Sequence, residues 1–424
     1  MTMKRRNFLQ LAALSGLSVA APFSLSRKVL ADDSLPALDS PFYVTVHASG
    51  GWDPTSFCDP KGRINDEQEN PVNMYYVDDI KQMGNHIYAP VAGAPAFFEK
   101  YYKELVVING VDMATNSHDG GTRNAWSGTL MEGYPSFAAL VAGVHAPEKP
   151  MSYLTNGGYD YSAGLVSPTR VGNTAALSRL AKPHLIDPNK EDRFHTEATE
   201  ARIRALRDKR LTDRMAKTTL PRYQQAMNML WTVRQGSNEL KLLQEFLPAT
   251  LDNSGNPLKK QAQLAMAAYK AGLAVSANLT LGGFDTHSNH DTNQFARLTM
   301  LLEGVDFLME EAILQGVAGK VIVLIGSDFG RTPGYNDGNG KDHWSVSSFM
   351  AMGPGIVGNR VVGASTASHK PLTVNPETLA LDENGIRITP GHINTALRAL
   401  AGIDNDILAA HYPLKEGLLP IFTG

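Results

Sequence analysis

Short apolar runs recur along the chain, and each ends at a glycine or a polar loop. Residues 42–48 alternate apolar and β-branched side chains, which predicts a strand. Residues 105–109 form a second short run that ends at Gly110. Residues 321–325 are an unbroken aliphatic run, as is typical of a strand covered on both faces in a parallel sheet. The pattern therefore predicts a buried sheet with polar loops at its strand ends.

Helical periodicity fills much of the chain between these runs. A predicted strand at 273–281 precedes a long amphipathic helix, which starts after residue 290 and returns the chain to the strand at 321–325. A strand–helix–strand unit of this kind implies parallel strands, so the chain is predicted to be an α/β protein. Residues 199–247 also carry apolar residues at helical spacing, and they predict a mainly helical insertion at about 195–256.

The first residues of the chain have the features of an export signal. A twin-arginine pair at 5–6 precedes an apolar stretch at 9–21, and small residues follow at 29–31. The apolar stretch is shorter than the roughly 20 residues that a spanning helix needs, which argues against a stable membrane anchor. We therefore predict a twin-arginine signal peptide at 1–31 and one α/β domain at 41–424.

This signal predicts a periplasmic or secreted protein whose first partner is the twin-arginine export machinery. That pathway moves folded proteins, so it suits a protein that acquires a metal before it leaves the cytoplasm. The formal net charge of −3 and the lack of a basic face argue against nucleic-acid binding. Cys58 is the only cysteine, so an internal disulfide is excluded and stability must come from core packing.

Carboxylates follow the first and last of the predicted strands. Two glycines after the strand at 42–48 let the backbone turn sharply and present Asp53 beyond it. Asp328 lies just past the strand at 321–325, where ligands bind in open α/β sheets. For Asp53, a carboxylate that caps a turn is the alternative interpretation.

A cluster of capping residues and glycines around Ser117 predicts the start of a helix. The N-terminus of a helix provides a positive field and free N–H groups, which favour an alkoxide nucleophile. Ser117 is the first choice for this role and Thr122 the second, and His118 is a candidate metal ligand. The alternative is that Ser117 only caps the helix.

Two loops are dense in Asp and His. Asp285 and His287 follow a pair of glycines after the strand at 273–281, and a Gly/Asn-rich loop ends in Asp342 and His343. Such a density exceeds what a turn needs and favours metal ligation.

If the strands are parallel neighbours, all of these groups face one crevice. Mixed carboxylate and imidazole ligands suit Zn²⁺ or Mn²⁺ better than Ca²⁺. One or two such ions would activate a hydroxyl nucleophile and neutralise charge on the substrate. The convergence of distant groups is thus the physical basis of the predicted site.

The order of these motifs resembles the family called domain of unknown function 1501 (DUF1501). The most specific pieces are residues 283–287, residues 327–332 and the pair at 342–343, and the resemblance spans residues 42–402. Members are often exported by the twin-arginine route and are related to the alkaline phosphatase and sulfatase superfamily. The resemblance implies a mainly parallel sheet sandwiched by helices, as in alkaline phosphatase.

The resemblance also implies how the ligands divide. One metal position would use Asp53, Ser117 and Asp328, and the other would use Asp285, His287 and His343. The chain departs from the superfamily pattern in two places. Phe329 stands where a His ligand is usual, and the spacing from Asp285 to its His is shorter than usual, so that His290 is a substitute ligand.

The implied function is a periplasmic metal-dependent hydrolase of phosphate or sulfate esters, with Ser117 as nucleophile. Its substrate would be a small-molecule or glycan anionic ester. Arg331 and Arg123 are candidates for holding the nonbridging oxygens, because a guanidinium offers paired donors; for each, a structural ion pair is the alternative. Two other functions stay open. One is a noncatalytic metal-binding or assembly protein on the same scaffold, and the other is a transferase of a phosphate-bearing headgroup.

Overall fold

A computed structural model describes residues 40–423 except 172–181, 183, 188–189 and 236–239. The predicted signal peptide at 1–31 lies outside these residues. Within the described part of the chain, every helix is too short or too polar to cross a membrane.

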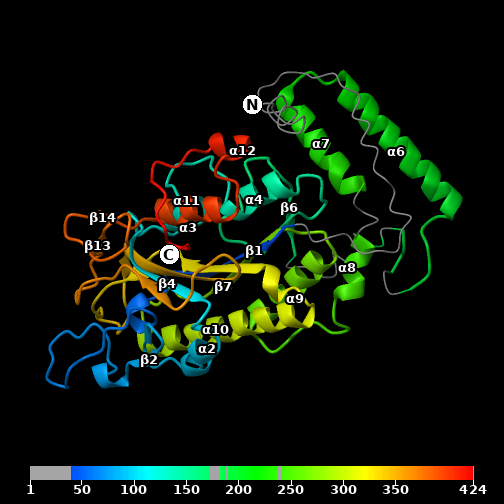
Figure 1. Cartoon of the computed structure of the whole chain (residues 1–424). Coiled ribbons are helices and arrows are strands. Elements are labelled where there is room, and N and C mark those ends of the chain that lie inside the picture. The colour runs from blue at the N-terminus through cyan, green and yellow to red at the C-terminus, as the bar shows by residue number, and fades with distance from the viewer. Residues whose placement is uncertain (1–39, 172–181, 183, 188–189, 236–239, 424) are drawn as a thin grey trace.

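The centre of the protein is an eight-stranded sheet (Figure 1). Its strands lie in the order β12 (Arg360–Val362), β4 (Leu105–Asp112), β11 (Val346–Met352), β8 (Val321–Ser327), β1 (Phe42–Ser49), β7 (Ser276–Gly282), β5 (Tyr153–Thr155) and β6 (Pro168–Arg170). β11 runs antiparallel to β4 and β8, and all other neighbours in this sheet pair in parallel. The prediction of a mainly parallel sheet is confirmed.

Helices cover both faces of the sheet because the central strands are apolar on both sides. On β1, Val44 and Val46 belong to one core, whereas Tyr43 belongs to the other. The first core is closed by α2 (Ala94–Tyr101), α9 (Pro257–Lys270) and α10 (His290–Leu314), and the second by α3 (His118–Ser127), α4 (Phe137–His145), α11 (Pro390–Leu400) and α12 (Ile407–Ala410). The predicted sandwich of a sheet between helices is confirmed.

The strand predicted at 105–109 does not end at Gly110 but continues to Asp112. Gly110 adopts a φ of +67°, and the pairing with β11 shifts register between Ser347 and Phe349. Such a bulge bends a strand without ending it, and glycine enters the positive-φ region without strain. The predicted end was wrong for this reason.

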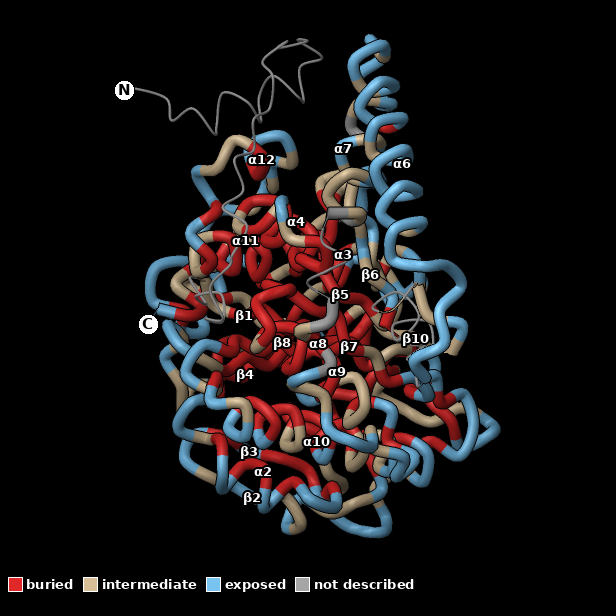
Figure 2. Tube along the Cα trace, turned by 90° about the vertical axis from the view of Figure 1, so that its right-hand side faces the viewer, coloured by how far each residue is buried: buried red, intermediate tan, exposed pale blue. Residues whose placement is uncertain are grey.

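Three helices occupy much of the range 195–256. They are α6 (Glu197–Lys217), α7 (Pro221–Gln235) and α8 (Leu240–Phe246). α6 and α7 extend away from the sheet (Figures 1 and 2), and Leu211 is the only buried residue of α6. α8 packs against α9. None of the candidate site residues lies on these helices, and the insertion stays a prediction.

The remaining elements are short and lie in the connections. They are β2 (Lys81–Met83) with β3 (His86–Tyr88), β9 (Gly330–Arg331) with β10 (His343–Trp344), β13 (Thr373–Val374) with β14 (Ile386–Arg387), and the 3₁₀ turns η1 (Pro54–Ser56), η2 (Val77–Asp79) and η4 (Ala318–Lys320). The β9–β10 hairpin matters most for the site, because it carries His343.

Candidate metal centre

The carboxyl ends of three parallel strands meet at one edge of the sheet. Ser49 at the end of β1 pairs with Gly282 of β7, and Ala48 pairs with Ser327 of β8. Gly50 then turns the chain with a φ of +119°, and a Cβ atom there would stand 2.5 Å from the backbone nitrogen of Asp285. A glycine is therefore required where the loops after β1 and β7 touch.

Asp328 is buried at this edge, and hydrogen bonds hold its carboxylate. Its Oδ1 accepts hydrogen bonds from the backbone N–H groups of Gly50 (3.0 Å) and Gly51 (2.7 Å), and its Oδ2 accepts from Nδ1 of His118 at 2.5 Å. Burial by itself raises the pKa of Asp328, but the hydrogen bonds, above all the one from His118, outweigh it and lower the pKa to about 2. The carboxylate is therefore ionised and holds His118 in place.

Two further histidines are oriented in the same way. Nδ1 of His343 donates to the backbone oxygen of Asn116 (2.8 Å), and Nδ1 of His287 donates to Oδ1 of Asp342 (2.7 Å). Carbonyl and carboxylate oxygens only accept, so each Nδ1 carries the proton and each Nε2 presents its lone pair. This is the arrangement by which proteins prepare imidazoles for a metal.

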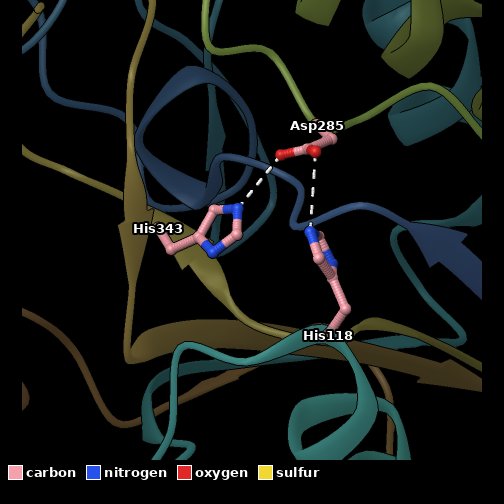
Figure 3. A group of neighbouring side chains, drawn as sticks. All are labelled: His118, Asp285 and His343. Carbon is pink, nitrogen blue, oxygen red and sulfur yellow. Dashed lines mark hydrogen bonds and ion pairs between the residues drawn. The ribbon is translucent and has the colours of Figure 1, made fainter.

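The three Nε2 atoms converge on Asp285. Nε2 of His118 lies 3.5 Å from one carboxylate oxygen, and Nε2 of His343 and Nε2 of His287 each lie 3.1 Å from the other. The ligand atoms of His118, Asp285 and His343 all lie within 4.8 Å of one another (Figure 3). The structure thus brings together four of the six residues predicted as ligands. Three of them, His118, Asp285 and His343, could hold one metal ion.

The chemistry of this group fits a divalent cation. Nε2 of His287 and Nε2 of His343 are 3.0 Å apart, and with both Nδ1 atoms protonated their lone pairs face each other. A cation between such atoms removes the repulsion. Three imidazoles and one carboxylate suit Zn²⁺ or Mn²⁺. The hydrogen bond to Asp328 raises the pKa of His118, so a metal there competes with a proton.

The group opens into a pocket of about 510 Å³. His118, Asp285 and Asp328 line it together with Thr122 and His47. The side chains of His118 and Asp285 are 42% and 44% exposed, which leaves their ligand atoms open to an incoming molecule. An open position next to a metal is typical of catalytic sites, whereas structural sites are closed.

Arg331 supports the site from beneath. It is fully buried, and its guanidinium donates to the backbone oxygens of Gly51 (2.9 Å), Gly50 and Lys341 (3.0 Å) and to Asp285 (2.6 Å). Burial opposes ionisation of Asp285, but the hydrogen bond and the positive charge of Arg331 outweigh it and lower the pKa of that carboxyl. From this position Arg331 joins three loops and does not reach the pocket.

Asp53 lies outside the metal group. Its buried carboxylate contacts Nζ of Lys341 at 2.6 Å and Nε2 of His290 at 3.0 Å, and it also caps the turn by accepting from the backbone N–H of Thr55. Lys341 therefore supplies the positive charge next to Asp53. His290, the substitute ligand, is held by Asp53 and by the hydroxyl of Thr286.

Ser117 is the N-cap residue of α3, as its sequence context predicts, but its hydroxyl makes no capping hydrogen bond. It is exposed and precedes His118 directly, although Thr122 and not Ser117 lines the pocket. Arg123 points toward another loop, where it donates to the backbone oxygen of Leu130 (2.8 Å) and lies 3.7 Å from Glu132.

Two residues of this region gave no signal in the sequence. Lys341 sits in a loop of Gly, Asn and Asp, where a lysine is normally solvated, yet it is fully buried. His47 lies within a run that reads as an ordinary strand, yet it lines the pocket. Both depend on partners more than 70 residues away, so local patterns could not reveal them.

Comparisons with known proteins give three findings. A family model described as "Protein of unknown function (DUF1501)" matches residues 43–379. No curated protein matches the sequence. Several solved structures are similar to this chain at low identity. One is a 2-O GAG sulfatase, with 10% identity and a TM-score of 0.33 over 89% of this chain and 76% of that chain.

Two more solved structures have other activities in their names. TAB5 alkaline phosphatase is 10% identical, with a TM-score of 0.35 over 88% of this chain and 99% of that chain. The lipoteichoic acid synthase LtaP from Listeria monocytogenes is 9% identical, with a TM-score of 0.38 over 88% of this chain and 74% of that chain.

Proposed function

The chain belongs to the DUF1501 family, whose model covers most of its length, and from this premise we propose that it is a metal-dependent hydrolase of phosphate or sulfate esters. One observation carries the proposal. The imidazoles of His118, His287 and His343 each form a hydrogen bond through Nδ1 and direct Nε2 toward the carboxylate of Asp285, at the edge of an open pocket. Histidines that ligate a metal almost always donate their other ring N–H to a carboxylate or a carbonyl oxygen in this way.

His118, Asp285 and His343 would hold the metal, and His287 is placed to complete the set. When bound, Zn²⁺ or Mn²⁺ supplies a Lewis acid that stabilises negative charge on the ester and lowers the pKa of a nearby hydroxyl. Asp328 and Asp342 act as positioning residues, because each fixes the ring of one ligand.

Ser117 is the proposed nucleophile. Its hydroxyl is free of the helix backbone and stands at the positive end of α3. Attack of Oγ on phosphorus or sulfur forms a serine ester and breaks the bond to the alcohol, which takes up the proton that Ser117 loses. Water then cleaves the serine ester and restores the hydroxyl. The pocket volume suits a small ester or the end of a glycan chain.

The test combines metal analysis with a substrate panel. Purified protein is expected to contain Zn or Mn near one ion per chain and to cleave an aryl phosphate, a phosphodiester or an aryl sulfate. Ser117→Ala is expected to lower kcat by roughly 1,000-fold, because the nucleophile is removed. Thr122→Val is the matched control and is expected to keep kcat within about tenfold.

Each result bears on a separate part of the proposal. Protein that takes up no metal after loading excludes the mechanism. Metal binding without turnover of any ester favours the noncatalytic binding protein. A loss of activity in Thr122→Val but not in Ser117→Ala moves the nucleophile to Thr122, which lines the pocket.

We also propose export to the periplasm through the twin-arginine pathway. The observation is the arginine pair Arg5 and Arg6 before an apolar stretch. Replacing both with lysine keeps the charge but removes the guanidinium groups, so the protein is expected to stay in the cytoplasm. Cell fractionation and immunoblotting measure the distribution, and unchanged export of the double-lysine variant would contradict the proposal.

A further inference from the structure

His47 is a buried histidine at the wall of the pocket. It lies on β1, is 3% exposed and lines the pocket beside Asp328 and Asp285. Its Nδ1 lies 3.1 Å from Nε1 of Trp126 on α3, with the two rings edge to face at 5.7 Å between centroids. One side of the imidazole is thus occupied by a residue of the core.

The contact with Trp126 sets the tautomer of His47. An indole N–H can only donate, so Nδ1 of His47 must accept and the ring proton must sit on Nε2. A second proton would place two N–H groups against each other. Burial also lowers the pKa of His47 and outweighs the nearby carboxylate of Asp328. The imidazole is therefore neutral and presents a fixed Nε2–H donor.

This donor has no partner among the described residues. The only hydrogen bond of the His47 side chain is the one to Trp126. Gly158 packs over the ring, where a Cβ would stand 3.3 Å from Cδ2, and the hydroxyl of Thr280, which pairs with His47 across the strands, is buried without a partner. Nε2 of His47 is not among the buried side-chain atoms that lack a partner, so its N–H is accessible from the pocket and can donate to a group that enters there.

We propose that Nε2–H of His47 donates a hydrogen bond to an oxygen of the tetrahedral anion, phosphate or sulfate, that the pocket receives. The proposal rests on the proposed function and names a further substrate-binding residue for it. The lining of the pocket contains Asp119, Asp285 and Asp328 but neither lysine nor arginine. A neutral donor therefore binds the anion beside the metal ligands, where the residues that line the pocket include no lysine or arginine.

Two substitutions of His47 distinguish the effect of losing the hydrogen-bond donor from the effect of losing the imidazole ring. The amide nitrogen of Gln reaches about as far as Nε2 of histidine, whereas that of Asn reaches only as far as Nδ1. In the zinc-loaded protein, calorimetric titration with inorganic phosphate and with sulfate is expected to show about tenfold weaker binding for His47→Asn. His47→Gln is expected to stay within about threefold of the wild type.

A nitrogen-15 NMR experiment reads the donor directly. The His47 ring is expected to show the proton on Nε2 in the free protein, and this signal is expected to shift when phosphate is added. Trp126→Phe removes the donor to Nδ1, so it is expected to release the second tautomer and to weaken phosphate binding. The spectrum also shows whether each variant is folded.

Equal affinities in the Asn and Gln variants overturn the assignment of His47, as does a His47 signal that phosphate does not move. Failure of the zinc-loaded wild type to bind either anion overturns it too. These outcomes are distinct from failure of the proposed function. If the protein binds phosphate through His47 but cleaves no ester, the binding role of His47 is supported and the hydrolase function is rejected. If His47→Asn turns over an ester with an unchanged KM, the hydrolase function is supported and the binding role of His47 is rejected.

Discussion

Replacing Asp285 with Asn is expected to weaken metal binding by about 100-fold or more and to remove ester hydrolysis with it. Asp285 is the one carboxylate on which His118 and His343 converge, and its charge also offsets Arg331 at 2.6 Å. An amide is a neutral and weaker ligand, and it leaves the buried guanidinium without its counter-charge. Zinc content after dialysis against a chelator of known affinity measures the effect.

Asp119→Asn is the matched control. Asp119 lines the same pocket and undergoes the same loss of charge, but it does not belong to the metal group. Its zinc content is expected to equal that of the wild type. If Asp285→Asn and Asp119→Asn lose zinc to the same extent, the ion is held by the summed negative charge of the pocket and not by ligation to Asp285. If neither variant loses zinc, Asp285 is not a ligand.

Breaking the buried ion pair between Asp53 and Lys341 is expected to lower the free energy of unfolding by about 3–5 kcal/mol. Both side chains are fully buried and 2.6 Å apart. Asp53→Asn leaves the ammonium of Lys341 without a counter-charge, which is the costly event. Urea unfolding followed by circular dichroism measures the change.

The pair also predicts acid sensitivity. Burial opposes ionisation of Asp53, but Lys341 and His290 outweigh it and hold the pKa of this carboxyl well below its usual value. A depressed folded-state pKa means stability that is fully present above the unfolded value of about 3.9 and is lost as the pH falls below it. The range from roughly pH 5 to pH 3 spans the unfolded-state pKa. Over this range, the wild type is therefore expected to lose more stability than a variant without the ion pair.

The double variant Asp53→Asn/Lys341→Met serves as that control. It removes both charges, so it is expected to recover much of the stability that Asp53→Asn loses. Zinc content separates this role from ligation. Folded Asp53→Asn with normal zinc indicates that Lys341 is the cation of Asp53, whereas lost zinc in the stable double variant indicates that Asp53 is a ligand.

The apolar pattern was sufficient for the architecture. The unbroken run at 321–325 became β8, because burial on both faces follows directly from composition. The two strands of the strand–helix–strand unit, β7 and β8, are parallel as predicted, and each pairs with β1, which lies between them. The predicted end of one strand was wrong because the local pattern fits two structures. A glycine after a short apolar run can mark the end of the strand or a bulge within it, and at Gly110 only the pairing with β11 decides between the two.

The sequence by itself determined which kinds of groups stand at the strand ends. Asp285, His287 and Asp328 follow strands whose parallel pairing brings their ends to one edge, so their meeting could be predicted from hydrophobic periodicity alone. Only the tertiary structure decided their tasks. Asp53 pairs with Lys341, and His47 accepts from Trp126, through contacts between distant segments. A buried charge or donor takes its role from whichever partner packing places beside it, and no local spacing encodes that choice.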